Sequence, residues 1–253
     1  MGGVSNCSGL TVIKLGGSVL TDAAAYRRAA AFVGTLAAVA GARVVVVVSA
    51  EFGHTDALLS EAQRLVAVPD PDALALLWST GELRSVALLT LALQSAGVRA
   101  AGLNVHEAGL RCVRPARGGR IAVNALGLRA AIARHRVVVV PGFLATSGTR
   151  VVTLERGGSD WSAVLLAGAL GASRCVLIKD VDGYYTGDPR TESAAQLIPA
   201  LSYDEALEMA DAGCPLVQRQ AVAEARARGV ELVVRSFDSE GTEMTSEVVL
   251  HRT

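Results

Sequence analysis

Two runs of valine constrain the fold of this chain more than any other feature of its sequence. Residues 44–48 are five consecutive valines, and residues 137–140 are four more. A β-branched run without polar alternation indicates a strand that is buried on both faces, as in a parallel sheet. Helical patterns lie between the expected strands, at about 23–40, 55–67, 72–94, 126–134 and 160–170. We therefore predict an α/β fold, a three-layer αβα sandwich with a mostly parallel central sheet.

Shorter signals complete the expected order of elements. Strands are predicted at 11–14, 98–103 and 175–179, and glycines and prolines predict a hairpin or flap at 104–123 and a hairpin at 143–154. The C-terminal part is expected to contain two helices, a strand and an edge strand at 247–250. The pattern predicts a single domain over 1–253 with two lobes, about 1–152 and about 153–253.

The composition excludes several classes of protein. Hydrophobic residues make up 51% and charged residues 19%, which is typical of a chain with a large core and excludes extended disorder. The formal net charge is zero and no basic block occurs, so neither nucleic acid nor a membrane is expected as a partner. The four cysteines are scattered without a C-x-x-C pair, which argues against a zinc site or disulfides and favours the cytoplasm. Neither a signal peptide nor a membrane-spanning segment is predicted.

A lysine followed by two glycines stands at the end of the first expected strand. The glycines let the backbone approach an anion closely, and Lys14 can neutralise charge on a phosphoryl group in transfer. A tight turn with a solvated lysine is the alternative, since the pattern is neither a Walker A sequence nor a dinucleotide fingerprint. A second glycine pair, at 157–158, opens an expected helix, where Asp160 is either part of an anion site or a helix cap.

Three further segments can carry chemistry. Residues 179–190 follow a buried strand at the edge where open α/β sheets bind ligands, and they can hold ribose, base and phosphate or form a solvated surface loop. Residues 49–56 follow the first valine run, and a turn capped by Thr55 explains them equally well. Glu82, beside a glycine in an expected helix, carries no signal of its own.

The order and separation of these five segments match those of one protein family. Residues 14–18 (K-L-G-G-S) are similar to K-F-G-G-S, and residues 48–56 to V-S-A-x-x-G-x-T-[ND]. Residues 81–85 resemble G-E-x-x-S, residues 156–160 are R-G-G-S-D without change, and residues 180–190 are similar to D-V-D-G-x-Y-T-x-D-P-R. In these motifs the chain resembles the amino-acid kinase family, most of all the catalytic domain of aspartate kinase.

The resemblance implies an ATP-dependent kinase that phosphorylates a small acidic amino acid, in the first place aspartate, to an acyl phosphate. It implies that Lys14 stabilises the transferring phosphoryl group and that Asp160 organises the site. The acceptor would be bound by Ser49, Thr55 and Glu82 of the first lobe and by Arg156, with Glu82 on the ammonium and Arg156 on a carboxylate. Nucleotide binding is implied, mainly in the second lobe, for Gly16, Gly17, Ser18, Gly157, Gly158, Ser159, Lys179, Asp180, Tyr185, Asp188 and Arg190. Mg²⁺ would be held mainly by the ATP phosphates, with no protein metal site.

The chain departs from the family pattern in its C-terminal part. Aspartate kinases continue into regulatory ACT domains, whereas this chain ends about one strand after the kinase core, so we expect no ACT domain and no feedback inhibition of the usual kind. The family segment G-A-K-V-L-H-P corresponds to residues 213–219, where Pro215 replaces a nucleotide-facing lysine. Arg219 and Lys179 are both candidates for the missing charge.

The segment after the first valine run departs as well. Glu51, Phe52 and His54 are unusual there, and we interpret His54 as a hydrogen-bonded loop histidine rather than a catalyst. Two alternatives to an aspartate kinase stay open. One is a kinase of this fold that acts on another carboxylate, a hydroxyl or a phosphate, and the other is a non-catalytic nucleotide-binding protein. The resemblance also implies a homodimer or higher homo-oligomer.

Overall fold

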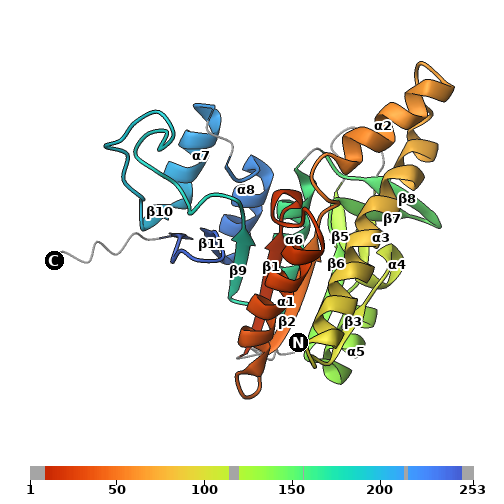
Figure 1. Ribbon diagram of the computed structural model, residues 1–253, viewed down its shortest axis with the longest axis horizontal. Helices are drawn as coiled ribbons and strands as arrows, with labels where there is room; N and C mark the ends of the chain where they lie inside the picture. Colours follow the sequence, from red (N-terminus) through yellow and green to blue (C-terminus); the bar gives the residue numbers. More distant parts are fainter. Residues whose placement is uncertain (1–8, 114–119, 156, 214–215, 247–253) are drawn as a thin grey trace.

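In the computed structural model, whose described residues are 9–113, 120–155, 157–213 and 216–246, an eight-stranded sheet crosses the molecule (Figure 1). Its strands, in spatial order, are β10 (Ala200–Ser202), β12 (Thr242–Thr245), β11 (Glu231–Arg235), β9 (Arg174–Ile178), β1 (Leu10–Leu15), β2 (Arg43–Val48), β6 (Val137–Pro141) and β3 (Ala100–Gly102). All neighbours are parallel except β11 and β12. The predicted mostly parallel central sheet is confirmed.

The valine runs form β2 and β6, two interior strands of this sheet, and are buried on both faces. Alternate residues point to opposite sides, so Val46 belongs to one core and Val45 and Val47 to the other. The Val46 core is covered by α1 (Ala23–Ala38) and α3 (Pro71–Ser95). The opposite core is covered by α4 (Val105–Ala108), α5 (Leu126–Arg134), α6 (Gly158–Leu170), α7 (Tyr203–Asp211) and α8 (Arg219–Arg228). Burial of each valine contributes about 1.5–3 kcal/mol, which explains why these runs dictate the three layers.

The two predicted hairpins join into a second, four-stranded sheet. Its order is β5 (Ile121–Val123), β4 (Leu110–Cys112), β7 (Leu144–Ser147) and β8 (Arg150–Thr153). Both hairpins are antiparallel, and β4 lies parallel to β7. The short helix α4 precedes β4, within the region predicted as a hairpin or flap.

The helices α2 (His54–Leu65) and α3 form a pair that projects from one end of the molecule (Figure 1). Asp70 starts α3 by accepting a hydrogen bond from the Ala73 N–H at 2.9 Å. In the described part of the chain, the 25-residue α3 is the one helix whose length and apolar composition would permit a membrane span, and 44% of its apolar window is buried in the molecule. It packs against α1 and the main sheet.

The C-terminal part differs from the prediction. The edge strand predicted at 247–250 lies outside the described residues, and the last described strand is β12, between β11 and β10. One edge of the sheet is formed by β10, which was not predicted. Its three residues are too few to display the alternation that identifies a strand.

Candidate active site

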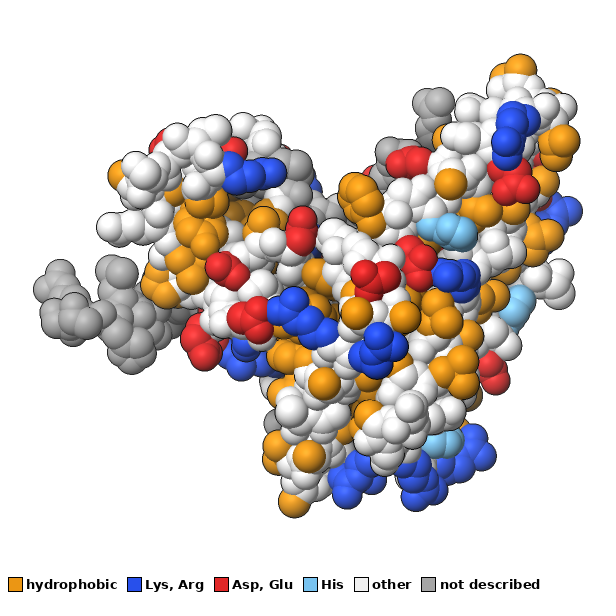
Figure 2. Space-filling view, in the orientation of Figure 1, with side chains coloured by type: hydrophobic (Ala, Val, Ile, Leu, Met, Phe, Trp, Pro, Cys, Tyr) orange, Lys and Arg blue, Asp and Glu red, His pale blue; other side chains and the backbone are white. Residues whose placement is uncertain are grey.

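A cleft with a volume of about 590 Å³ opens at the carboxyl ends of β1, β2 and β9. The molecule is hollowed between the α2–α3 pair and the part that carries α7 and α8 (Figure 2). Most of the predicted site residues line this cleft: Lys14, Gly16, Gly17, Ser18, Ser49, Thr55, Glu82, Gly157, Ser159, Asp160, Lys179 and Asp180. The fold therefore brings together residues from both halves of the chain at the edge where open α/β sheets bind ligands.

Two lysines and one aspartate form the centre of the cleft. Lys14 is near the end of β1, and its Nζ lies 2.8 Å from Oδ1 of Asp160. Lys179 directly follows β9, and its Nζ donates to the other oxygen, Oδ2, at 2.7 Å. All three side chains are nearly buried, with exposed fractions of 9%, 15% and 4% for Lys14, Lys179 and Asp160.

Strand alternation explains why these three groups meet. Val12 on β1 and Leu177 on β9 belong to the core that contains α6, so residues two positions further along point to the same face. Those residues are Lys14 and Lys179. The strands β1 and β9 are neighbours, and Asp160 lies in the first turn of α6, over the gap between them.

The charges in this triad shift the pKa values of Asp160 and Lys179. Burial alone would raise the pKa of Asp160, but the adjacent Lys14 and Lys179 outweigh it and lower that pKa to about 2. Burial lowers the pKa of Lys179, Asp160 opposes this, and the like charge of Lys14 lowers it further. Asp160 is therefore ionised at neutral pH and holds two ammonium groups at the floor of the cleft.

The turn after Lys14 is shaped for a close approach of backbone. A Cβ on Gly17 would lie 2.4 Å from the Ala50 carbonyl oxygen, and the Gly17 carbonyl accepts a hydrogen bond from the Phe52 N–H at 3.1 Å. No side chain larger than hydrogen fits there. The hydroxyl of Ser18 donates to Asp180 at 3.0 Å, which links this turn to the loop after β9.

The N-terminus of α6 forms a neighbouring wall. Gly157 has a φ of 82°, a left-handed conformation that favours glycine, and the helix starts directly after it. The hydroxyls of Ser49 and Ser159 are hydrogen-bonded at 2.9 Å, which ties the end of β2 to this helix. Free N–H groups at a helix N-terminus favour anions, so this wall suits a phosphate or carboxylate.

Glu82 lines the cleft and is 3% exposed. Burial raises its pKa to about 8, although a hydrogen bond with the Ala50 backbone and the charge of Lys14 oppose the rise. Its Oε2 atom is buried and makes no hydrogen bond with any described residue. A buried carboxyl oxygen without a partner is costly, and a cationic or hydrogen-bonding ligand would satisfy it.

Some predicted site residues do not line the cleft. Tyr185, Asp188 and Arg190 lie in the loop further from its floor, where the Tyr185 hydroxyl contacts Asp182 and the Arg190 N–H donates to Asp188. Gly158 is buried against Leu154 in the first turn of α6. Arg156 and Pro215 lie outside the described residues. Their predicted roles stay predictions.

Phe143 is a cleft residue that sequence reasoning missed. It is the one described non-glycine residue with a positive φ, 62°, and its ring packs edge-on against Trp78 with centroids 5.9 Å apart. The left-handed backbone turns the chain sharply after β6, and residues held in this conformation concentrate at functional sites. The preceding Pro-Gly signals a turn, but nothing in the sequence indicates that Phe143 enters the cleft.

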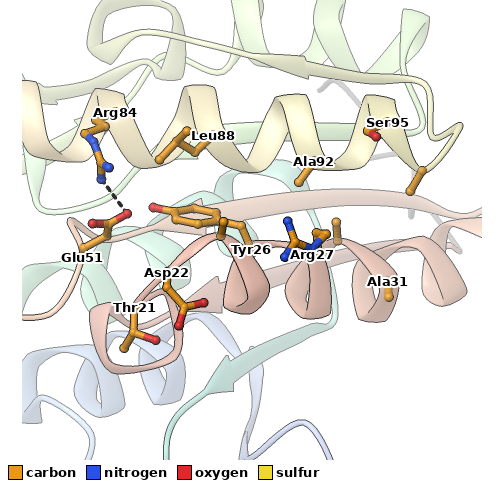
Figure 3. A pocket seen from close by; sticks show the side chains of 13 residues that line it. Thr21, Asp22, Tyr26, Arg27, Ala31, Glu51, Arg84, Leu88, Ala92 and Ser95 are labelled. Atoms are coloured by element: carbon orange, nitrogen blue, oxygen red, sulfur yellow. Dashed lines mark ion pairs between the residues drawn. The ribbon is translucent and has the colours of Figure 1, made fainter.

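The unusual Glu51 belongs to a second cavity. A groove of about 650 Å³ runs between α1 and α3, and Figure 3 shows Glu51 facing Arg84 at one end, with the Tyr26 hydroxyl pointing toward them. The Glu51–Arg84 ion pair measures 2.5 Å. Glu51 touches both the groove and the cleft, but its charge is matched by Arg84. Its presence therefore adds no net charge to the cleft.

The interpretation of His54 as a loop histidine needs correction. His54 is the first residue of α2, and its backbone N–H donates to the Glu51 carbonyl at 3.0 Å. Its ring lies over Gly81 of α3, where an added Cβ would be 2.8 Å from the ring. His54 packs the two helices together beside Glu82.

Comparison with known proteins agrees with this geometry. The chain belongs to the amino acid kinase family, whose family model matches residues 9–236. The aspartokinase of Helicobacter pylori is 41% identical over 211 residues, which cover 82% of this chain and 52% of that protein.

The crystal structure of aspartate kinase from Synechocystis matches with a TM-score of 0.84 and 36% identity over 95% of this chain and 41% of that chain. Escherichia coli aspartokinase III in complex with aspartate and ADP matches with a TM-score of 0.77 and 27% identity over 95% of this chain and 65% of that chain. This chain spans about half the length of the curated relatives it matches.

Proposed function

We propose that this chain transfers the terminal phosphoryl group of ATP to the side-chain carboxylate of aspartate. One observation carries the proposal: the buried Asp160 carboxylate holds the ammonium groups of Lys14 and Lys179 in the cleft that also contains the buried carboxyl of Glu82. The two lysines held by Asp160 suit a polyphosphate, and the buried carboxyl of Glu82 suits an acceptor with an ammonium group. The named relatives are aspartokinases, which supports the same reaction here.

In this proposal the residues of the chain align the reactants and neutralise charge. An unperturbed aspartate carboxyl titrates near ~3.9, so the acceptor is already a nucleophile at neutral pH and needs no general base. MgATP supplies the phosphoryl group, and ADP is the leaving group. The turn at Gly16 and Gly17 approaches the phosphates, and Lys14 neutralises negative charge as the phosphoryl group moves. Asp160 keeps the lysine side chain in place.

The acceptor would be held on the side of the cleft formed by residues 1–152. Glu82 would bind its ammonium, which would favour the ionised carboxylate and lower the raised pKa. Ser49 and Thr55 line the same cleft, and Arg156 is assigned to a substrate carboxylate from its motif alone. The nucleotide would extend over residues 153–253, along the loop that contains Tyr185.

Magnesium would enter with the nucleotide. Among the described residues, no group of three or more His, Cys, Asp or Glu side chains could hold a metal ion. The two lysines and the backbone of the glycine turn are instead donors for phosphate oxygens, so the ion would keep phosphate and water ligands. We also propose a cytoplasmic homodimer or higher homo-oligomer, as the family resemblance implies.

A hydroxylamine trap tests the reaction directly. The protein is mixed with aspartate, MgATP and hydroxylamine, and aspartyl hydroxamate and ADP are measured. We expect both products in equal amounts with the wild type, and at least a 100-fold lower rate with Lys14→Met. Release of ADP with another acceptor and no hydroxamate from aspartate would replace the acceptor. Nucleotide binding without turnover on a panel of carboxylates, alcohols and phosphates would favour the non-catalytic alternative.

A further inference from the structure

Lys179 has an environment almost identical to that of Lys14. Each ammonium contacts one oxygen of the same carboxylate, at 2.8 Å for Lys14 and 2.7 Å for Lys179. Each side chain projects from the end of a central strand onto the α6 face, and both line the cleft. A residue that only contacted ribose or base would not need to share the buried anion that positions the phosphate-binding lysine.

The charge balance of this triad leaves room for an anion. Two ammonium groups and one carboxylate carry a net charge of +1, and all three are nearly buried. An ammonium group has three donors, so each lysine keeps donors after bonding to Asp160. Asp180, which follows Lys179 and also lines the cleft, accepts a hydrogen bond from Ser18, and its charge favours the ammonium form of Lys179. The donors that remain on the two ammonium groups can bind the oxygens of a phosphoryl group in the cleft.

The other candidate for an additional cation is positioned elsewhere. The Nε of Arg219 lies 2.8 Å from Oδ1 of Asp211, and both side chains are mostly exposed, at 60% and 59%. Arg219 does not line the cleft. Of the two residues considered for the charge that is missing at Pro215, only Lys179 therefore lies beside Asp160.

We infer that Lys179 is a second catalytic cation, which contacts the transferring phosphoryl group together with Lys14. The inference rests on the proposed kinase reaction, and it changes the role of Lys179 from a general nucleotide ligand to a group that acts on the reacting phosphate. With one lysine on β1 and one directly after β9, the developing charge would be neutralised from both halves of the chain.

Three substitutions at this position separate charge from structure. Lys179→Met removes both the charge and the hydrogen bond, Lys179→Gln keeps a donor for Asp160 without the charge, and Lys179→Arg keeps the charge. We expect Met and Gln to lower kcat by about 100-fold with a much smaller change in the KM for the acceptor, and Arg to restore part of the rate. Arg219→Met, which removes a cation outside the cleft, should leave kcat unchanged. Full activity in Lys179→Gln would overturn the inference, because a structural donor would then suffice.

Nucleotide binding provides a readout that does not require turnover. Isothermal titration with MgATP and MgADP should show that Lys179→Gln weakens binding of ATP about 10-fold more than binding of ADP, since only ATP carries the phosphoryl group in question. Equal losses for the two nucleotides would overturn the role of Lys179 and leave the kinase proposal intact. A wild type that binds ATP but phosphorylates no acceptor would overturn the kinase proposal. In that case, a selective loss of ATP affinity in Lys179→Gln would still support a contact between Lys179 and the terminal phosphate.

Discussion

Glu82 shows how the surroundings of a single residue set a dependence on pH. Its pKa is raised to about 8, so the folded protein retains a proton that the unfolded chain loses near pH 4.5. The stability provided by this difference is complete below about pH 4.5 and is lost as the pH rises through about 8, by at most about 1.4 kcal/mol per pH unit. Glu82→Gln should abolish this loss. Urea unfolding at pH 5 and pH 8.5 measures it, with the exposed Glu61→Gln as control, and equal pH dependence in both variants would contradict the assignment.

Gly17 and Gly34 are a matched pair of glycines with opposite expectations. A Cβ on Gly17 would meet the Ala50 carbonyl oxygen at 2.4 Å, and backbone on both sides would have to move. Gly17→Ala should therefore lower kcat/KM for ATP at least 10-fold, because it displaces the turn that we propose to approach the phosphates. Gly34, inside α1, has only an ordinary contact with Val98 at 3.5 Å, so Gly34→Ala should raise the free energy of unfolding by about 0.5–1 kcal/mol. Steady-state kinetics and urea unfolding of both variants check the pair, and an active Gly17→Ala would show that the turn tolerates a side chain.

The sequence motifs predicted which residues enter the cleft better than they predicted how those residues interact. Lys14, Glu82 and Asp160 were identified because their motifs are local in sequence. The bond between Lys179 and Asp160 depends on β1 and β9 being neighbours in the sheet, which no local pattern encodes. The burial of Glu82 depends in the same way on how α3 packs against the end of β2. A raised pKa is a property of that packing, so the sequence alone could not reveal it.

At the scale of secondary structure, the elements with strong local sequence signals were predicted accurately. The valine runs of β2 and β6, and the helix at Leu126–Arg134, were predicted with little error because long apolar runs and helical periodicity are local properties. The strand β10 and the pairing of β4 with β7 were missed. β10 has three residues, and the pairing joins two hairpins that are separated in sequence by α5 and β6. Such contacts arise from the packing of the whole chain.

The start of α3 offers a test of how one cap supports the site. Asp70 accepts the Ala73 N–H, and Pro71 begins the helix that carries Glu82. Asp70→Ala should lower the free energy of unfolding by about 1 kcal/mol, whereas Asp70→Asn, which keeps an acceptor, should cost much less. Kinetic constants should stay unchanged, because Glu82 lies about three turns further along. Chemical denaturation of the two variants distinguishes a cap from a surface charge, and equal losses for Ala and Asn would identify the charge as the cause.

At the scale of the molecule, one sheet joins the two parts of the chain that the sequence divided into lobes. β1 comes from the first part and pairs with β9 of the second along four residue pairs, and β2 continues the same sheet on its other side. The core on the α6 face contains residues of both parts, from Leu10 to Met244. The lysines that hold Asp160 come from both sides of this junction. A separation of the two parts would therefore expose a continuous core and dismantle the site at once.

This continuity predicts that the molecule unfolds as one cooperative unit. Leu89 on α3 and Leu232 on β11 are both fully buried but belong to different parts of the chain, and replacing either by alanine should cost about 2–5 kcal/mol. In differential scanning calorimetry each variant should lower the midpoint of the same single transition by about 4–20 °C, with calorimetric and van't Hoff enthalpies that agree. Leu91→Ala, at a position that is 61% exposed, is the matched control and should shift the midpoint far less. Two separate transitions, each moved by only one of the buried substitutions, would mean that the two parts fold independently. The bond between Lys179 and Asp160 would then form inside the second part alone, and Lys14 would contact Asp160 only after the two parts assemble.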